Sequence, residues 1–98
     1  MPKNQGPANN SVAALSAENT FTTPVNVTGL FNLSITGIWV GTITIQRSFD
    51  SGTVWKDVNT FTANTEAMDI EPEGVVVWRA GFKTGQYTSG TANVRISQ

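Results

Sequence analysis

From residue 21 onward, hydrophobic and polar residues alternate with a period of two, and the segments are rich in Val, Ile, Thr, Phe and Trp. Gly, Asn, Asp and Pro interrupt them every several residues. This pattern is typical of short strands joined by tight turns. It predicts strands over the segments Leu30–Thr36, Val40–Phe49, Val54–Phe61, Glu66–Ile70, Val75–Lys83 and Thr91–Ser97. No convincing amphipathic helix is present, so the domain is expected to be all-β.

The alternation within each segment indicates how it is buried. Leu30–Thr36 places Phe31, Leu33 and Ile35 on one face and Asn32, Ser34 and Thr36 on the other, as in a strand with one solvated side. Val40–Phe49 and Val54–Phe61 flank a short turn, so they are expected to pair as a hairpin. Val75–Lys83 is a continuous apolar run, which predicts a central strand with Trp78 in the core.

Strands of this number and length predict a small antiparallel β-sandwich, either immunoglobulin-like or of the jelly-roll kind. The strand order stays open, because the hydrophobic pattern does not contain it. At 98 residues the chain is long enough for one domain with a small core.

Residues 1–20 differ from the rest because they are polar and lack the period-two alternation. We interpret them as an extended N-terminal arm that precedes a sandwich domain of residues 21–98. The short apolar segment Val12–Leu15 is expected to form a helical turn or to lie in a groove of a neighbouring molecule. Val12 and Leu15 are therefore candidate interaction residues.

Composition narrows the possible chemistry. The chain contains no Cys and no His, which excludes thiolate chemistry, disulfides, imidazole base catalysis and most zinc sites. The net charge is -1, so the chain lacks the excess of basic residues with which proteins bind nucleic acid or an anionic membrane. The absence of a long apolar run predicts folding in a cytoplasm. No cofactor is expected.

The stretch Ser48–Trp55, which reads SFDSGTVW, resembles the Asp-box, a hairpin motif repeated around the propellers of sialidases. Asp50 is placed to accept backbone N–H bonds, Gly52 permits positive φ, and Ser48 and Trp55 stand on the joined strands. The motif occurs once, in a chain too short for a propeller. We interpret it as a structural turn, with a calcium or sugar site as the alternative.

Other polar residues are weighed in the same way. Four acidic residues lie close together in the sequence: Glu66, Asp69, Glu71 and Glu73. We interpret them as a solvated strand edge rather than as the carboxylate pair of a glycosidase or as a cation site. A Ser–Lys arrangement through Lys56 or Lys83 lacks a nucleophile motif. The sequence therefore predicts a protein that is not an enzyme.

The three tryptophans raise the question of sugar binding, because an exposed ring can stack on the apolar side of a sugar. Trp39 and Trp55 are the two that the pattern leaves open to solvent. Trp39 is therefore a further candidate interaction residue. The competing interpretation is that all three rings belong to the core.

Residues 39–97 contain the run WVGTITIQRSFDSGTVWKDV and end in SGTANVRI. This region resembles a group of small virion proteins of tailed bacteriophages, in which W-x-G-T-[VI]-x-[LIV]-Q-R-S-x-D-x-G-x-x-W recurs. Asp50 and Gly52 match the group's turn, whereas Val54 departs from the Asp-box, where Thr is usual. The resemblance covers about two thirds of the chain and excludes the arm.

What the resemblance implies is a capsid decoration or cement protein located in the virion. Its expected partners are the major capsid protein or other virion proteins, with several copies associating, for example as a trimer. The arm and a sheet face are expected to bind the shell. The alternative from another class is a carbohydrate- or receptor-binding module of a phage tail or fibre.

Overall fold

The computed structural model describes residues 10–74 and 76–98 of the chain. These residues form a single antiparallel sheet that does not close, and none of them is helical, which confirms the all-β prediction. The strands are β1 (Asn10–Leu15), β2 (Thr20–Phe21), β3 (Val25–Asn26), β4 (Gly29–Ser48), β5 (Lys56–Phe61), β6 (Thr65–Glu71) and β7 (Val77–Ser97).

Two long strands, β4 and β7, pair with each other at the centre of the sheet. Their ladder runs from Asn32 opposite Ser97 to Ser48 opposite Val77. β4 joins two predicted strands, Leu30–Thr36 and Val40–Phe49, and β7 likewise joins the last two. The prediction that these were separate strands is wrong, because the chain bends sharply without leaving the sheet. Val75 itself lies outside the described residues.

Glycines make the bend possible. Gly37 has a φ of 105°, and a Cβ placed there would lie 2.5 Å from the carbonyl oxygen of Thr91. Gly90 has a φ of 85°, and a Cβ there would collide with the carbonyl oxygen of Ile38. Any other residue at either position would combine a disfavoured backbone conformation with a backbone clash.

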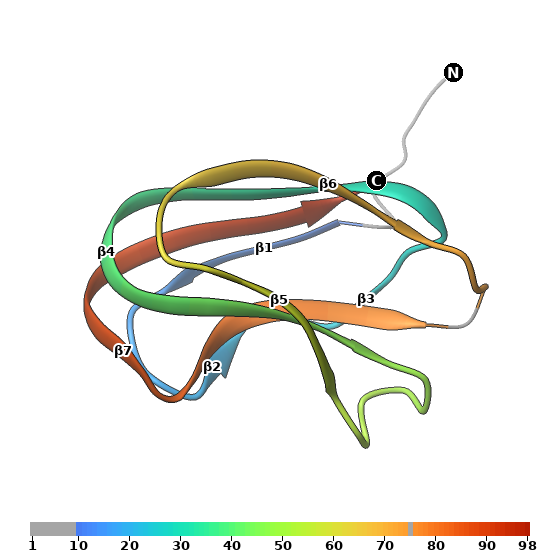
Figure 1. The fold of residues 1–98 in the computed structure, drawn as a ribbon, viewed down its shortest axis with the longest axis horizontal. Coiled ribbons are helices and arrows are strands. Elements are labelled where there is room, and N and C mark those ends of the chain that lie inside the picture. Colours follow the sequence, from blue (N-terminus) through green and yellow to red (C-terminus); the bar gives the residue numbers. More distant parts are fainter. Residues whose placement is uncertain (1–9, 75) are drawn as a thin grey trace.

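The bend folds the sheet into two halves that face each other, as β4 and β7 show on the left of Figure 1. Half-sheet A contains β1, residues 90–97 of β7, residues 29–38 of β4, and β6. Half-sheet B contains β2, β3, residues 77–84 of β7, residues 43–48 of β4, and β5. Phe31 of half-sheet A packs on Trp78 of half-sheet B with ring centroids 4.8 Å apart.

The core lies between the half-sheets and is built by inward residues of β1, β3, β4 and β7, together with Val27 and Val76 from the connections. Trp78 is buried there, as predicted. Burying one such aliphatic or aromatic side chain contributes about 1.5–3 kcal/mol. The buried hydrophobic residues are Leu15, Val25, Val27, Phe31, Leu33, Ile35, Ile43, Ile45, Val76, Trp78, Ala80, Phe82, Ala92, Val94 and Ile96.

Part of the predicted arm belongs to the sheet. Asn10–Leu15 forms β1, which pairs with the end of β7 from Ala92 to Ser97, so the helical turn does not form. Leu15 is buried in the core, whereas Val12 points outward and is 64% exposed. The remainder of the arm, residues 1–9, lies outside the described residues.

Candidate functional site

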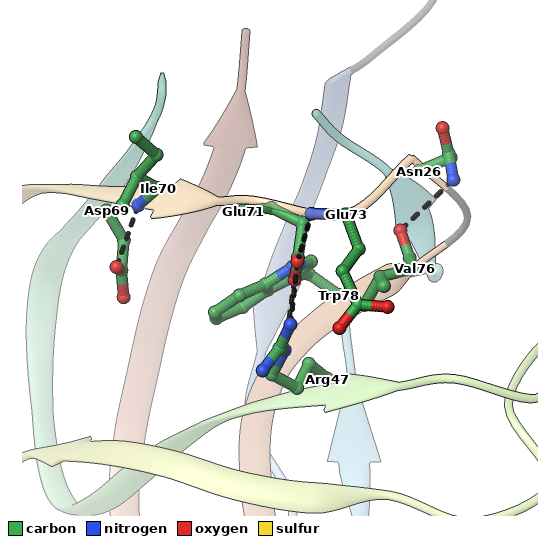
Figure 2. A network of polar contacts seen from close by, with 8 residues as sticks. All are labelled: Asn26, Arg47, Asp69, Ile70, Glu71, Glu73, Val76 and Trp78. Carbon is green, nitrogen blue, oxygen red and sulfur yellow. Dashed lines mark hydrogen bonds and ion pairs between the residues drawn. The ribbon is translucent and has the colours of Figure 1, made fainter. Parts of the chain in front are cut away.

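A buried carboxylate closes the end of the sheet opposite the bend. Glu71, the last residue of β6, has an exposed fraction of 0%. Arg47 of β4 donates to both of its oxygens, from Nε at 2.9 Å and from Nη2 at 2.6 Å. Trp78 Nε1 and the Glu73 backbone N–H also donate, at 3.0 and 2.9 Å (Figure 2). The prediction of a solvated edge is therefore wrong for Glu71.

The geometry of Glu71 makes it a structural link rather than a proton donor. Burial raises the pKa of its carboxyl, but the bonds from the Glu73 N–H, Arg47 and Trp78 outweigh this and the pKa lies below its ordinary value. A carboxylate held ionised in this way is poorly suited to general acid catalysis. Because Glu71 belongs to half-sheet A and Arg47 to half-sheet B, the ion pair ties the two halves together.

A groove of about 540 Å³ runs beside this link, between the edge strands β5 and β6. Lys56 and Asp57 line it from β5, and Asp69 and Ile70 line it from β6. Asp57 is engaged elsewhere: it accepts bonds from Lys83 at 2.7 Å and from Gln46 at 2.7 Å, which lower its pKa. No nucleophile and base are paired among the lining residues of this groove.

The Asp-box-like stretch forms a tight turn between β4 and β5. Ser48 Oγ donates to the Asp50 carboxylate at 2.7 Å and accepts the Gly52 N–H at 2.9 Å. Asp50 accepts the Val54 N–H at 2.9 Å, the type of backbone bond expected from the sequence. The bonds from Ser48 and Val54 lower the pKa of Asp50. The polar groups of the turn thus satisfy one another.

Trp55, the last residue of the motif, lies over the outer side of half-sheet B. The Arg79 guanidinium sits 4.2 Å from the Trp55 ring centroid and 3.8 Å from that of Phe21. Arg79 Nε donates to Gln46 at 2.9 Å, and Gln46 donates in turn to Asp57. Cation–π contacts of this kind are worth about 0.5–2 kcal/mol each.

We call this surface the B face. Its members are Phe21, Thr44, Gln46, Asp57, Arg79 and Lys83, with Trp55 lying over them. Polar and cation–π contacts link all of these side chains except that of Thr44. The face is therefore largely occupied with its own internal contacts.

Trp39 lies at the bend and is half-buried. Its ring meets Phe82 edge-on with centroids 5.8 Å apart, and its Nε1 donates to Asn64 Oδ1 at 2.8 Å. Asn64 in turn donates to the Gly37 carbonyl oxygen at 3.0 Å, so Trp39 holds the β5–β6 connection against the bend. Neither Trp39 nor Trp55 presents a fully exposed ring.

The outer side of half-sheet A, which we call the A face, has a different character. Leu30, Met68 and Ile70 are 61%, 68% and 62% exposed. Leu30 stands directly opposite Ile70 in the ladder, and Met68 stands opposite Asn32. The members of the A face are Asn10, Val12, Ala14, Leu30, Asn32, Ser34, Thr36, Ile38, Glu66, Met68, Ile70, Thr91, Asn93, Arg95 and Ser97.

Sequence reasoning named one apolar member of this face, Val12, and missed the cluster of Leu30, Met68 and Ile70. The signal was present, because period-two alternation puts all three opposite the buried positions of their strands. The sequence did not show that the three side chains lie together, because their proximity depends on the pairing of β4 with β6. Leu15, the other candidate from the arm, is in the core.

Comparisons with protein-family models, with curated proteins and with solved structures find no match. Within the described part of the chain, no group of three potential ligand residues is arranged to hold a metal ion. No helix in residues 10–74 and 76–98 is long and apolar enough to span a membrane.

Proposed function

We propose that this chain is a non-enzymatic structural protein of a bacteriophage virion, a decoration or cement protein that binds the capsid shell. The observation that carries the proposal is the A face, which is apolar at one corner and bears two charged side chains among its described members, Glu66 and Arg95. Such a surface offers contact area to another protein rather than a reactive group.

The sequence run shared with small phage virion proteins supports the same assignment and supplies the location. The proposed fold type is a β-sandwich, immunoglobulin-like or jelly-roll. Attachment through the N-terminal segment and a sheet face, repeated over many copies, gives firm binding even where each contact is weak. This function requires no catalytic group and no cofactor.

The alternative function, a carbohydrate- or receptor-binding module, requires an aromatic ring free to stack on a sugar. The Trp55 ring is covered by Arg79, and Trp39 is held at the bend by Phe82 and Asn64. These contacts favour the structural protein over the sugar-binding module.

The test is co-sedimentation of the purified protein with phage shells that lack it. We expect saturable binding at a fixed stoichiometry. Removing residues 1–9 is expected to weaken binding, whereas removing 1–20 would also delete β1 and unfold the edge of the sheet.

The matched control replaces residues 1–9 by a Gly/Ser linker of the same length and compares its unfolding curve with that of the full chain. An unchanged curve with reduced shell binding assigns the effect to the segment. Absence of any binding by the full chain would refute the proposed function, and binding on a sugar array would then favour the carbohydrate-binding module.

A further inference from the structure

The two charges of the A face stand in one row across the sheet. Ser34 of β4 pairs with Glu66 of β6 on one side and with Arg95 of β7 on the other. Neighbouring strands lie about 5 Å apart, so Glu66 and Arg95 flank β4 at equal distances on its two sides. One acidic and one basic side chain therefore stand symmetrically about a single strand.

Neither of these two charges has an oppositely charged partner among residues 10–74 and 76–98. No ion pair joins Arg95 to any described residue, and the described side chains offer it no hydrogen bond. Glu66 accepts one hydrogen bond, from Ser34 Oγ at 2.5 Å, and has no cationic partner in the described chain. The two ion pairs of the described residues, Arg47 with Glu71 and Lys83 with Asp57, lie off the A face.

The arrangement is self-complementary about an axis parallel to β4. A two-fold rotation about such an axis lays β4 of one copy over β4 of the other and exchanges the positions of β6 and β7. Glu66 of each copy then faces Arg95 of the other, which gives two identical ion pairs. The same operation brings Leu30 against Leu30 of the second copy.

We infer that the A face binds the A face of a second copy of this chain, through a two-fold contact with its axis along β4. The inference deepens the proposed function and rests on it for its biological setting, because it names the partner of the sheet face. The protein that the A face contacts within the virion is then a second copy of this chain, and the paired copies bind the shell through their N-terminal segments and the sheet surface that this contact leaves uncovered.

Other symmetric arrangements of the same face are less favourable. A two-fold axis along the row of Glu66, Ser34 and Arg95 would place Glu66 over Glu66 and Arg95 over Arg95, with like charges opposed. Two sheets packed face to face about 10 Å apart bring such charges close enough to repel strongly. Of these two arrangements, only the axis along β4 places each Glu66 opposite an Arg95 and also buries the exposed Leu30.

The experiment measures the mass of the purified protein by sedimentation equilibrium over a concentration series. The wild type is expected to reach twice the chain mass of 10.5 kDa. Arg95→Glu and Glu66→Arg are each expected to weaken the dimer about 10-fold or more, because two contacts become repulsive at once. The double variant Glu66→Arg with Arg95→Glu restores both pairs and is expected to recover wild-type association.

Lys56→Glu is the matched control, because it changes the net charge by the same amount from an exposed site on β5 of half-sheet B. It is expected to leave the dimer unchanged. A far-ultraviolet circular dichroism spectrum of each variant confirms folding. A monomeric wild type, a trimer, a dimer indifferent to Arg95→Glu, or a double variant without recovery would each overturn the inference.

The result separates this inference from the proposed function, because mass is measured without shells. A monomer that still co-sediments with shells refutes the two-fold contact and leaves the virion role intact. A charge-dependent dimer that ignores shells supports the contact and refutes the virion role.

Discussion

The outer faces of the two half-sheets differ in how their side chains are used. On the B face, Arg79, Gln46, Asp57 and Lys83 are linked in series by hydrogen bonds and an ion pair, and two aromatic rings enclose Arg79. On the A face, one side-chain hydrogen bond joins two described members, and large apolar side chains stand exposed. The B face is thus stabilised by its own side-chain contacts, whereas the A face leaves large apolar side chains and both of its charges open to solvent.

The largest expected effect comes from breaking the link between the two half-sheets. Glu71→Ala leaves Arg47 and the Trp78 Nε1–H without their acceptor, so we expect the free energy of unfolding to fall by about 3 kcal/mol. This is the lower end of the range for a broken buried pair, because the Arg47 side chain is 24% exposed and regains water. Urea unfolding at low protein concentration measures the loss.

Glu73→Ala is the control for Glu71→Ala, because the exposed Glu73 contributes its backbone N–H and not its carboxylate to the network. We expect a change within about 0.5 kcal/mol. Equal losses from the two variants would show that the Arg47–Glu71 link does not hold the half-sheets together.

A matched pair of substitutions, one on each face, tests the comparison directly. Arg79→Ala removes contacts with two rings and a hydrogen bond to Gln46, and is expected to cost about 2 kcal/mol. Leu30→Thr alters an exposed A-face residue and is expected to change monomer stability by less than about 0.5 kcal/mol. Chemical denaturation of dilute protein measures both. A larger loss from Leu30→Thr would reverse the assigned roles of the two faces.

Acid is expected to destabilise the protein gradually. The pKa values of Asp57, Asp50 and Glu71 are lowered in the folded protein, so the unfolded chain takes up protons first as pH falls. Their contribution is present in full above the unfolded values of about 4 and is lost as pH falls through the folded values. Thermal melts between about pH 6 and pH 3 follow this loss. A melting temperature that is flat in this interval would contradict the assignment.

The sequence predicted the strands better than their connections. Period-two alternation marked the inner residues of β4 and of the second part of β7, and a continuous apolar run marked the first part of β7. The turn residues at Ser48–Trp55 indicated the β4–β5 turn. It did not reveal that Gly37 and Gly90 bend continuous strands, because a glycine at a bend and a glycine in a turn look alike along the chain. What distinguishes them is the partner strand, which is remote in sequence.

The two largest errors of the sequence prediction concern β1 and Glu71. β1 was missed because Ala13 and Ala14 are too small to display an alternation, although Leu15 occupies the core. Glu71 was assigned to a solvated edge because its neighbours along the chain are acidic and exposed. Its buried environment depends on Arg47 and Trp78, which the fold brings to it from two other strands.

The pairing of β1 with the end of β7 has a consequence for how the protein is made. A ribosome releases the N-terminal strand first, yet the partner of Ser11 is Ile96 and that of Leu15 is Ala92. β1 therefore cannot pair until residues 92–97 of β7 have been synthesised, and Leu15 lacks its place in the core until then. The edge of half-sheet A is thus completed late in folding, by a strand that is synthesised before all the other described strands.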